Sequence, residues 1–124
     1  MDNILQKIGQ ASAIVNDNNT AKYVKSGDMD VFSTPMMVAL MEEAACNCIK
    51  PYLPDEQSSV GININVNHIK ASKVGANITA KATVTGQDGK KIEFAVNAFD
   101  DGGEIGNGTH TRFIVDREKF LSRL

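Results

Sequence analysis

The sequence predicts an α+β fold in which an antiparallel sheet wraps around one long central helix. The segment from Met36 to Ile49 is apolar almost all round, which is typical of a helix that other elements cover. From Val60 onward the spacing of apolar residues changes to a period of two, which is typical of strands. Short turns rich in glycine and aspartate separate these strands and favour antiparallel pairing of neighbours.

The first predicted elements are a strand with its loop and then the helix. From Ala11 to Val24 the chain alternates weakly around a run of asparagine and aspartate, which favours a strand and a loop over a helix. The helix is expected to begin at Thr34, because threonine caps a helix N-terminus and Pro35 suits the first helical position. It is expected to end at Lys50, because Pro51 bars its continuation.

Four strands are predicted after the helix. The first runs from residue 60 to residue 68, and its apolar face is expected to lie toward the helix, with Gly61 and three asparagines on the other face. The residues expected on the helix side are Val60, Ile62, Ile64, Val66 and His68. The other strands fall within residues 76–85, 92–98 and 105–115, joined by the turns GQDGK and DDGGE. Asp116 is then placed to cap a short terminal helix.

This order of elements matches the hotdog fold, and residues 1–124 are expected to form a single domain of that kind. One sheet that wraps one helix leaves the edge of the sheet exposed. We therefore expect a homodimer, in which a site between the two subunits would be completed.

Composition narrows the choice of partners. The chain has 13 basic and 15 acidic residues and no basic run, so we expect no nucleic acid partner. The N-terminus has no long apolar stretch, which predicts no membrane span and a cytoplasmic protein. Cys46 and Cys48 lack the spacing of a structural zinc site, so we expect reduced thiols and no metal ion. Gly106 and Gly108 lack the lysine of a phosphate-binding loop and are expected to relieve crowding in a strand.

Two adjacent carboxylates on the helix are predicted to lie in different environments. Glu43 shares its stripe of the helix with Asn47 and Lys50, which indicates the wetter edge. Glu42 shares its stripe with apolar residues, so its carboxylate is expected to enter a largely dry environment, where it needs a partner. Glu42 is therefore either a structural hydrogen-bonding group at a subunit contact or a candidate base or nucleophile.

Three more residues have both a structural and a catalytic interpretation. Thr34 is a helix cap, yet its hydroxyl also lies where a helix N-terminus favours developing negative charge. His68, expected on the same side as Glu42, is either a core histidine or a general acid or base. Gly61 is either a flexible joint or a point where substrate approaches the backbone and an N–H binds an oxyanion.

Three blocks of sequence occur in order along the chain: STPMMVALMEEAA, SSVGININVNHIKAS and GNGTHTRFIVD. Together they resemble the fluoroacetyl-CoA thioesterase family of hotdog proteins, over about residues 20 to 116. The resemblance implies that Thr34, Glu42 and His68 act together in catalysis. It also implies substrate-binding roles for Gly61, ahead of the strand, and for Arg112 in the closing G-x-G-x-H-x-R segment.

The resemblance implies an acyl-CoA thioesterase that hydrolyses a small or medium-chain acyl-CoA to the carboxylic acid and free CoA, without a cofactor. The alternatives are a non-catalytic hotdog module that binds acyl-CoA or acyl-carrier groups, and a hotdog dehydratase. One segment departs from the family, in which phenylalanines form a lid ahead of the helix. Here the segment reads YVKSGDMDVF and has no aromatic residue between Tyr23 and Phe32. We therefore expect little preference for fluoroacetyl over acetyl groups.

Overall fold

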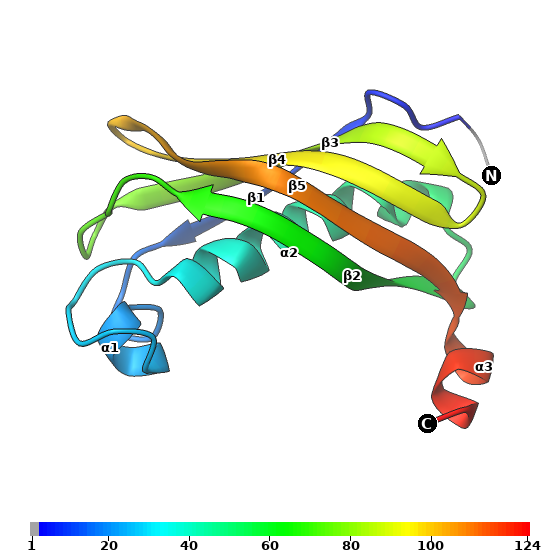
Figure 1. The fold of residues 1–124 in the computed structure, drawn as a ribbon, viewed down its shortest axis with the longest axis horizontal. Coiled ribbons are helices and arrows are strands. Elements are labelled where there is room, and N and C mark those ends of the chain that lie inside the picture. Colours follow the sequence, from blue (N-terminus) through cyan, green and yellow to red (C-terminus); the bar gives the residue numbers. More distant parts are fainter. Residues whose placement is uncertain (1–2) are drawn as a thin grey trace.

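The computed structural model describes residues 3–124, in which five strands form one antiparallel sheet that curves over a long helix (Figure 1). The strand order across the sheet is β1-β3-β4-β5-β2, so β1 and β2 are the two edges. The strands are β1 (Ile8–Ile14), β2 (Gln57–His68), β3 (Asn77–Asp88), β4 (Lys91–Asp100) and β5 (Gly103–Asp116). The helices are α1 (Ala21–Val24), α2 (Thr34–Ile49), the 3-10 turn η1 (Lys50–Tyr52) and α3 (Arg117–Ser122). The predicted arrangement of an antiparallel sheet around one long helix is confirmed.

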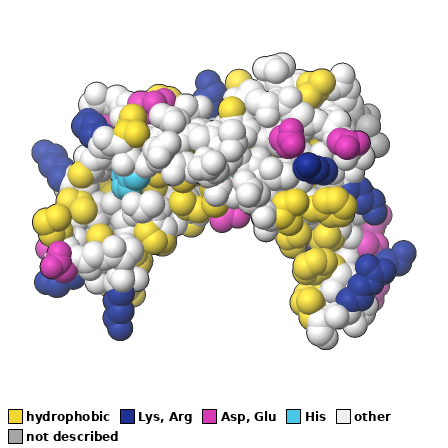
Figure 2. Space-filling view, viewed as in Figure 1, with side chains coloured by type: hydrophobic (Ala, Val, Ile, Leu, Met, Phe, Trp, Pro, Cys, Tyr) yellow, Lys and Arg dark blue, Asp and Glu magenta, His cyan; other side chains and the backbone are white. Residues whose placement is uncertain are grey.

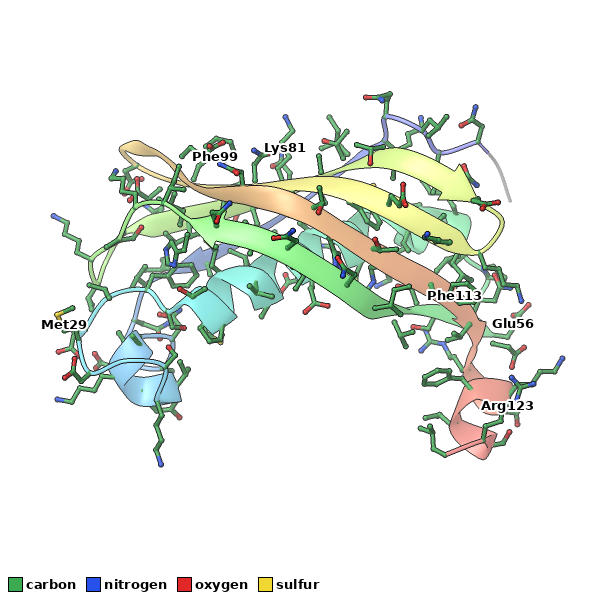
Figure 3. All side chains as sticks on the ribbon, in the orientation of Figure 1. Met29, Glu56, Lys81, Phe99, Phe113 and Arg123 are labelled. Atoms are coloured by element: carbon green, nitrogen blue, oxygen red, sulfur yellow. The ribbon has the colours of Figure 1, made fainter. Side chains whose placement is uncertain are left out.

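The core lies between α2 and the concave face of the sheet. Alternate residues of β3 and β4 point toward the helix and are buried, while Lys81 of β3 and Phe99 of β4 point away from it (Figure 3). The largest fully buried side chains include Phe94, Met37, Met41, Ile49, Ile78 and Ile92. α2 packs mainly against β1 and β3 and much less against β2. The side of the helix toward β2 is therefore the more open one.

The N-cap of α2 lies one residue earlier in the sequence than predicted. Ser33 is the N-cap, and its hydroxyl accepts a hydrogen bond from the Met36 amide at 3.2 Å. Ser33 is fully buried and has the extended backbone that a capping residue needs. Thr34 is instead the first helical residue, so the prediction that Thr34 caps α2 is wrong. Its hydroxyl is free for another contact.

The N-terminal segment also differs from the prediction. β1 begins at Ile8, ahead of the predicted start at Ala11, and the loop after it contains the short helix α1, which was not predicted. Thr20 caps α1 by accepting a hydrogen bond from the Tyr23 amide at 3.2 Å. At the other end of the chain, Asp116 caps α3 as predicted.

A bulge in β2 changes which of its residues face the helix. The register with β5 shifts between Gly61 and Asn63, so Ile62 is the extra residue and is 55% exposed. A Cβ atom added to Gly61 would point at Glu42 of α2, so Gly61 faces the helix and Val60 faces the opposite way. The prediction that Val60 and Ile62 share the helix-facing side is therefore wrong. A strand without a bulge would have kept one alternation throughout.

The predicted crowding at the glycines of β5 is confirmed. A Cβ atom on Gly108 would lie 2.7 Å from the Val66 Cα of the neighbouring strand, and one on Gly106 would lie 2.5 Å from the Met37 sulfur. Side chains at these two positions would push β2 or α2 away from β5. These glycines therefore permit close packing and do not form a loop.

α1 and α3 stand at opposite ends of the arch, with a hollow between them (Figure 2). Hydrophobic side chains border both ends of the hollow. The exposed hydrophobic side chains of the chain include Tyr23 of α1, Met29 of the loop after α1, Phe113 of β5 and Leu121 of α3, all at least 40% exposed. No helix within residues 3–124 is long and apolar enough to span a membrane.

Replacing Gly9 of β1 with alanine should destabilise the protein by about 1–3 kcal/mol, because the methyl group would overlap the backbone of α2. A Cβ atom there would lie 2.6 Å from the Cys48 Cα. Urea denaturation measures the change in the free energy of unfolding. Gly102→Ala is the control, because its Cβ would meet mainly the end of the flexible Lys70 side chain. Equal losses of stability in the two variants would contradict this account.

Candidate active site

Thr34 and His68 form a hydrogen-bonded pair at the start of α2 and the end of β2. The Thr34 Oγ1 and His68 Nδ1 atoms are 2.8 Å apart. The other ring nitrogen, Nε2, is buried and has no hydrogen-bond partner among residues 3–124. The ring also meets Phe32 edge-on, with 6.5 Å between ring centroids. Because buried polar atoms normally have partners, the unpartnered Nε2 atom is an exception in this structure.

His68 is held in its neutral form. Burial lowers the pKa of His68 below its ordinary value of 6.5, and the nearby Lys70 backbone opposes the shift. The imidazole is therefore mainly uncharged at neutral pH, so it can accept a proton there.

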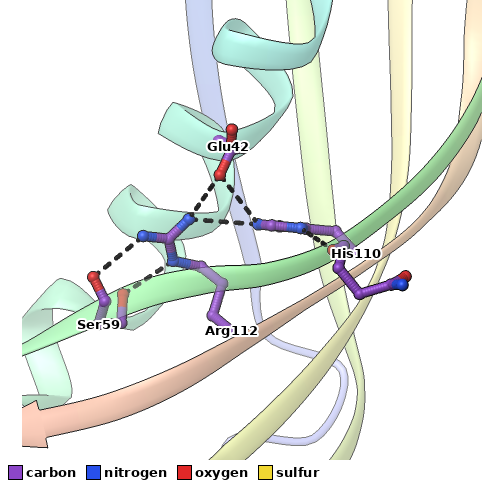
Figure 4. Close-up of polar contacts among 5 residues, drawn as sticks. Glu42, Ser59, His110 and Arg112 are labelled. Carbon is purple, nitrogen blue, oxygen red and sulfur yellow. Dashed lines mark hydrogen bonds and ion pairs between the residues drawn. The ribbon is translucent and has the colours of Figure 1, made fainter.

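Glu42, two turns further along α2, is paired with Arg112 of β5 (Figure 4). The Arg112 Nη1 atom donates to Glu42 Oε2 at 3.1 Å. The guanidinium also donates from Nε to Ser59 Oγ at 2.8 Å and from Nη2 to the Ser59 carbonyl at 3.1 Å. Since the guanidinium is planar and its donors are fixed in direction, these bonds define where the Glu42 carboxylate lies.

His110 of β5 completes this cluster. Its side chain is 1% exposed and stacks on Phe94, with 5.9 Å between ring centroids. Its Nδ1 atom lies 2.7 Å from the Asn63 carbonyl oxygen, and its Nε2 atom lies 3.3 Å from Arg112 Nη1 and 3.8 Å from Glu42 Oε2. Burial lowers the pKa of His110, and the charge of Arg112 lowers it further. The Asn63 carbonyl and the charge of Glu42 raise the pKa in part.

Gly61 borders the same cluster because it has no side chain. A Cβ atom at this position would meet the Glu42 carboxylate directly, and would lie 3.2 Å from both Arg112 Nη1 and His110 Cε1. The backbone of β2 therefore approaches the carboxylate more closely than any other residue type would allow. The sequence-based interpretation of Gly61 as a point where substrate approaches the backbone stays a prediction, since the group that approaches it in the structure is the Glu42 carboxylate.

The environment of Glu42 is wetter than predicted. Its side chain is 39% exposed, so the prediction of a largely dry carboxylate is wrong for the single chain. The reason is that α2 is poorly covered on the side toward β2, the last strand of the sheet. Glu43 and Asn47 are exposed, as predicted.

The structure brings the predicted residues together in two groups and not in one. Thr34 contacts His68, whereas Glu42 contacts Arg112 and borders Gly61. Eight residues of α2 separate Thr34 from Glu42, which is about 12 Å along a helix. No hydrogen bond or ion pair within residues 3–124 links the two groups directly.

Ser59 and His110 were not singled out from the sequence as site residues. His110 and Arg112 are two residues apart on one strand, so their side chains share a face, and this spacing could have indicated that both reach the site. Nothing in the local sequence distinguishes Ser59 from its neighbour Ser58. No cluster of metal-ligating side chains suited to a metal ion occurs in the part of the chain that is described.

A pocket of about 300 Å³ lies beside this cluster. Its walls come from α2, η1, β2 and α3, and include Cys46, Ile49, Leu53, Pro54, Ser59 and Arg117. Cys46 is one helical turn beyond Glu42, and Ser59 is hydrogen-bonded to Arg112. The pocket therefore shares Ser59 with the cluster, but Glu42 itself does not line it.

Comparisons with known proteins agree with this architecture. The family model for fluoroacetyl-CoA-specific thioesterase matches residues 15–118. A fluoroacetyl-CoA thioesterase from Streptantibioticus cattleyicolor is 37% identical over 95 residues, which are 77% of this chain and 68% of that protein.

Solved structures show the same fold. A structure of the fluoroacetyl-CoA thioesterase FlK superposes with a TM-score of 0.93 at 29% identity, over 99% of this chain and 96% of that chain. A hot-dog-like protein from Thermanaerovibrio acidaminovorans superposes with a TM-score of 0.86 at 21% identity, over 96% of this chain and 88% of that one, which supports the fold alone. The predicted hotdog fold is confirmed, and the chain belongs to the fluoroacetyl-CoA-specific thioesterase family.

Proposed function

We propose that this protein hydrolyses small and medium-chain acyl-CoA esters at the seam between α2 and β2, with Thr34, Glu42 and His68 as its catalytic residues. Membership of the family makes it an acyl-CoA thioesterase, which releases a carboxylic acid and free CoA. One observation supports the proposed site: the Thr34–His68 pair and the Glu42–Gly61 contact both connect α2 with β2. Thr34 of α2 contacts His68 of β2, and Glu42 of α2 borders Gly61 of β2.

Glu42 supplies the carboxylate for the proposed reaction. It either attacks the thioester carbonyl carbon or takes a proton from the water molecule that attacks it. The carbonyl oxygen gains negative charge, which we assign the Gly61 N–H to stabilise. The C–S bond then breaks, and His68, oriented by Thr34, assists the transfer of a proton to the departing sulfur. If Glu42 has attacked the carbonyl carbon, water then hydrolyses the anhydride formed on Glu42, which releases the carboxylic acid and restores the carboxylate. The substrate-binding role of Arg112 stays a prediction, and in the described residues its Nη1 donates to the reacting carboxylate.

We propose a homodimer formed through β2. This strand is 12 residues long and its outer edge pairs with no other strand within residues 3–124. An exposed edge of this length favours pairing with another strand. The hollow between α1 and α3 leaves room beside that edge for a second copy (Figure 2).

A two-fold axis beside β2 would bring the Thr34–His68 pair of one copy toward Glu42 of the other copy. In an antiparallel pair of β2 strands, the His68 end of one copy lies toward the Gln57 end of the other. The Thr34–His68 pair of one copy then approaches Glu42 of the other. This arrangement accounts for a catalytic set that is divided along the helix within one chain.

The pocket beside Cys46 and Leu53 supports a medium-length acyl group. Its volume of about 300 Å³ lies at the lower end of the range for small-molecule sites. We propose that it takes the acyl chain as it leaves Glu42, which suits chains of about four to eight carbons.

We propose a cytoplasmic location. Cys46 and Cys48 are both free thiols. Neighbouring thiols that stay reduced are typical of proteins in a reducing compartment.

Glu42→Gln should lower kcat for acyl-CoA hydrolysis by about a hundredfold or more, because the amide cannot act as base or nucleophile. Glu43→Gln is the matched control, since Glu43 is the exposed neighbour on the same helix. The measurement is thiol release from a panel of acyl-CoA esters. Tight acyl-CoA binding by calorimetry without hydrolysis would instead favour the non-catalytic binding module, and loss of water from a 3-hydroxyacyl-CoA would favour a dehydratase.

Mixing two inactive variants tests whether one site is built from two chains. Glu42→Gln and His68→Ala homodimers are each expected to be inactive, but a mixed dimer would keep one site free of both changes. After unfolding and refolding together at equal concentration, random pairing should restore about a quarter of the wild-type activity. Sedimentation establishes that the species are dimers. Dimers that regain no activity would show that each site belongs to a single chain.

The protein should show little preference for fluoroacetyl-CoA over acetyl-CoA. The segment between Tyr23 and Phe32 has no aromatic side chain to close over a small acyl group, and it carries Lys25, Ser26 and Asp28. Small apolar differences contribute only about 1–3 kcal/mol even in a fitted pocket. The measurement is kcat/KM for the two esters and for a longer chain. A fluoroacetyl preference of about a thousandfold or more would exceed that contribution and contradict this interpretation.

A further inference from the structure

His110 has no part in the reaction as proposed, yet it is among the largest fully buried side chains of the protein. A buried histidine at the centre of an active site either fills space or holds other groups. The ring of His110 makes two polar contacts in opposite directions, one to the Asn63 carbonyl and one to Arg112. Space filling alone does not require either contact, because Phe94 already packs on the face of the ring.

The two contacts determine where the proton of the ring lies. The Asn63 carbonyl can only accept a hydrogen bond, so His110 Nδ1 carries a proton and donates it at 2.7 Å. The Arg112 guanidinium can only donate, so His110 Nε2 accepts from Nη1 at 3.3 Å. Only the neutral tautomer with its proton on Nδ1 satisfies both contacts.

Arg112 Nη1 has two protons, and the cluster uses both. One is donated to Glu42 Oε2 at 3.1 Å and the other to His110 Nε2. The remaining contacts of the guanidinium go to Ser59. His110 therefore holds the side of the guanidinium that meets Glu42, whereas Ser59 holds the opposite side.

We propose that His110 is a positioning residue that acts through Arg112: by accepting a hydrogen bond at Nε2, it keeps the Arg112 guanidinium in the orientation that presents the Glu42 carboxylate to the substrate. This inference rests on the proposed reactive role of Glu42. The bulge in β2 takes part in it, because the Asn63 carbonyl that orients the ring follows the bulge directly.

Protonation of His110 would disrupt the cluster. The charged groups in contact with the ring are Glu42 from α2 and Arg112 from β5, while β2 contributes the Asn63 carbonyl and β4 the uncharged Phe94. With a proton on Nε2, the ring would face Arg112 as a second donor and a second cation, and would turn its new N–H toward Glu42, 3.8 Å away. The active form is thus lost as the pH falls through the pKa of His110, which lies below 6.5.

The tautomer can be observed directly, without any substrate. The chain contains only two histidines, so a ¹⁵N–¹H spectrum of the imidazole nitrogens shows two rings, and the His68→Ala variant assigns them. We expect His110 to be neutral at pH 7 with its proton on Nδ1. A proton on Nε2, or a charged ring, at pH 7 would overturn the proposal.

Two substitutions separate the two contacts of the ring. His110→Gln places a carbonyl oxygen near the position of Nε2 and keeps an acceptor for Arg112, whereas His110→Asn keeps only a donor for the Asn63 carbonyl. We expect His110→Asn to lower kcat by about tenfold to a hundredfold, because the carboxylate loses its position, with a smaller change in KM. His110→Gln should keep most of the wild-type kcat and extend activity to lower pH.

The outcomes distinguish failure of the proposed function from failure of the proposed role of His110. Wild-type protein that hydrolyses no acyl-CoA would defeat the proposed function, while the tautomer of His110 would remain measurable. A second outcome would overturn the role of His110 alone. In it the wild-type protein is active and Glu42→Gln is inactive, but His110→Gln and His110→Asn have equal kcat and unchanged pH profiles. Thermal unfolding measures the stability of His110→Gln and His110→Asn. If the two variants are equally stable, a loss of stability alone would lower kcat by the same factor in both.

Discussion

The structure depends on one constraint: α2 is apolar on nearly every side, yet its own sheet covers only part of it. β1 and β3 supply most of the cover, and Gly9 allows β1 to approach until its backbone nearly touches the helix near Cys48. The side toward β2 stays half open. Thr34 and Glu42, which we propose as catalytic residues, lie on that side, where a polar side chain can reach a ligand without leaving the hydrophobic core exposed elsewhere.

Electrostatics explains how a carboxylate is held on this open side. Arg112 is 6% exposed, and a buried guanidinium is costly unless its donors are satisfied. Its four hydrogen bonds go to Ser59, Glu42 and His110, so most of its N–H donors are satisfied. Glu42 thereby faces a cation whose position does not depend on Glu42 itself. A partly exposed carboxylate next to a fixed cation is held in one direction, which base or nucleophilic chemistry requires.

The bulge at Ile62 connects the fold with the chemistry. One extra residue reverses the alternation of β2, so Gly61 faces Glu42 before the bulge, while Ile64 and His68 lie toward the helix side after it. Without the bulge, either Gly61 or His68 would point away from α2. The same irregularity presents the Asn63 carbonyl to His110. A single local feature of an edge strand thus serves both polar groups of the site.

The sequence by itself determined the fold class, the length of α2 and the four strands that follow it, because the periods of 3.6 and two are local properties of the chain. The matched motif blocks also indicated Thr34, Glu42, His68, Gly61 and Arg112. Only the tertiary structure decided that Ser33 and not Thr34 caps the helix, that Glu42 is partly exposed, and that the site residues form two groups. These features depend on which side of α2 the sheet leaves open and on a one-residue shift between β2 and β5. Neither changes the local pattern of residues, because both arise from contacts between segments far apart in the chain.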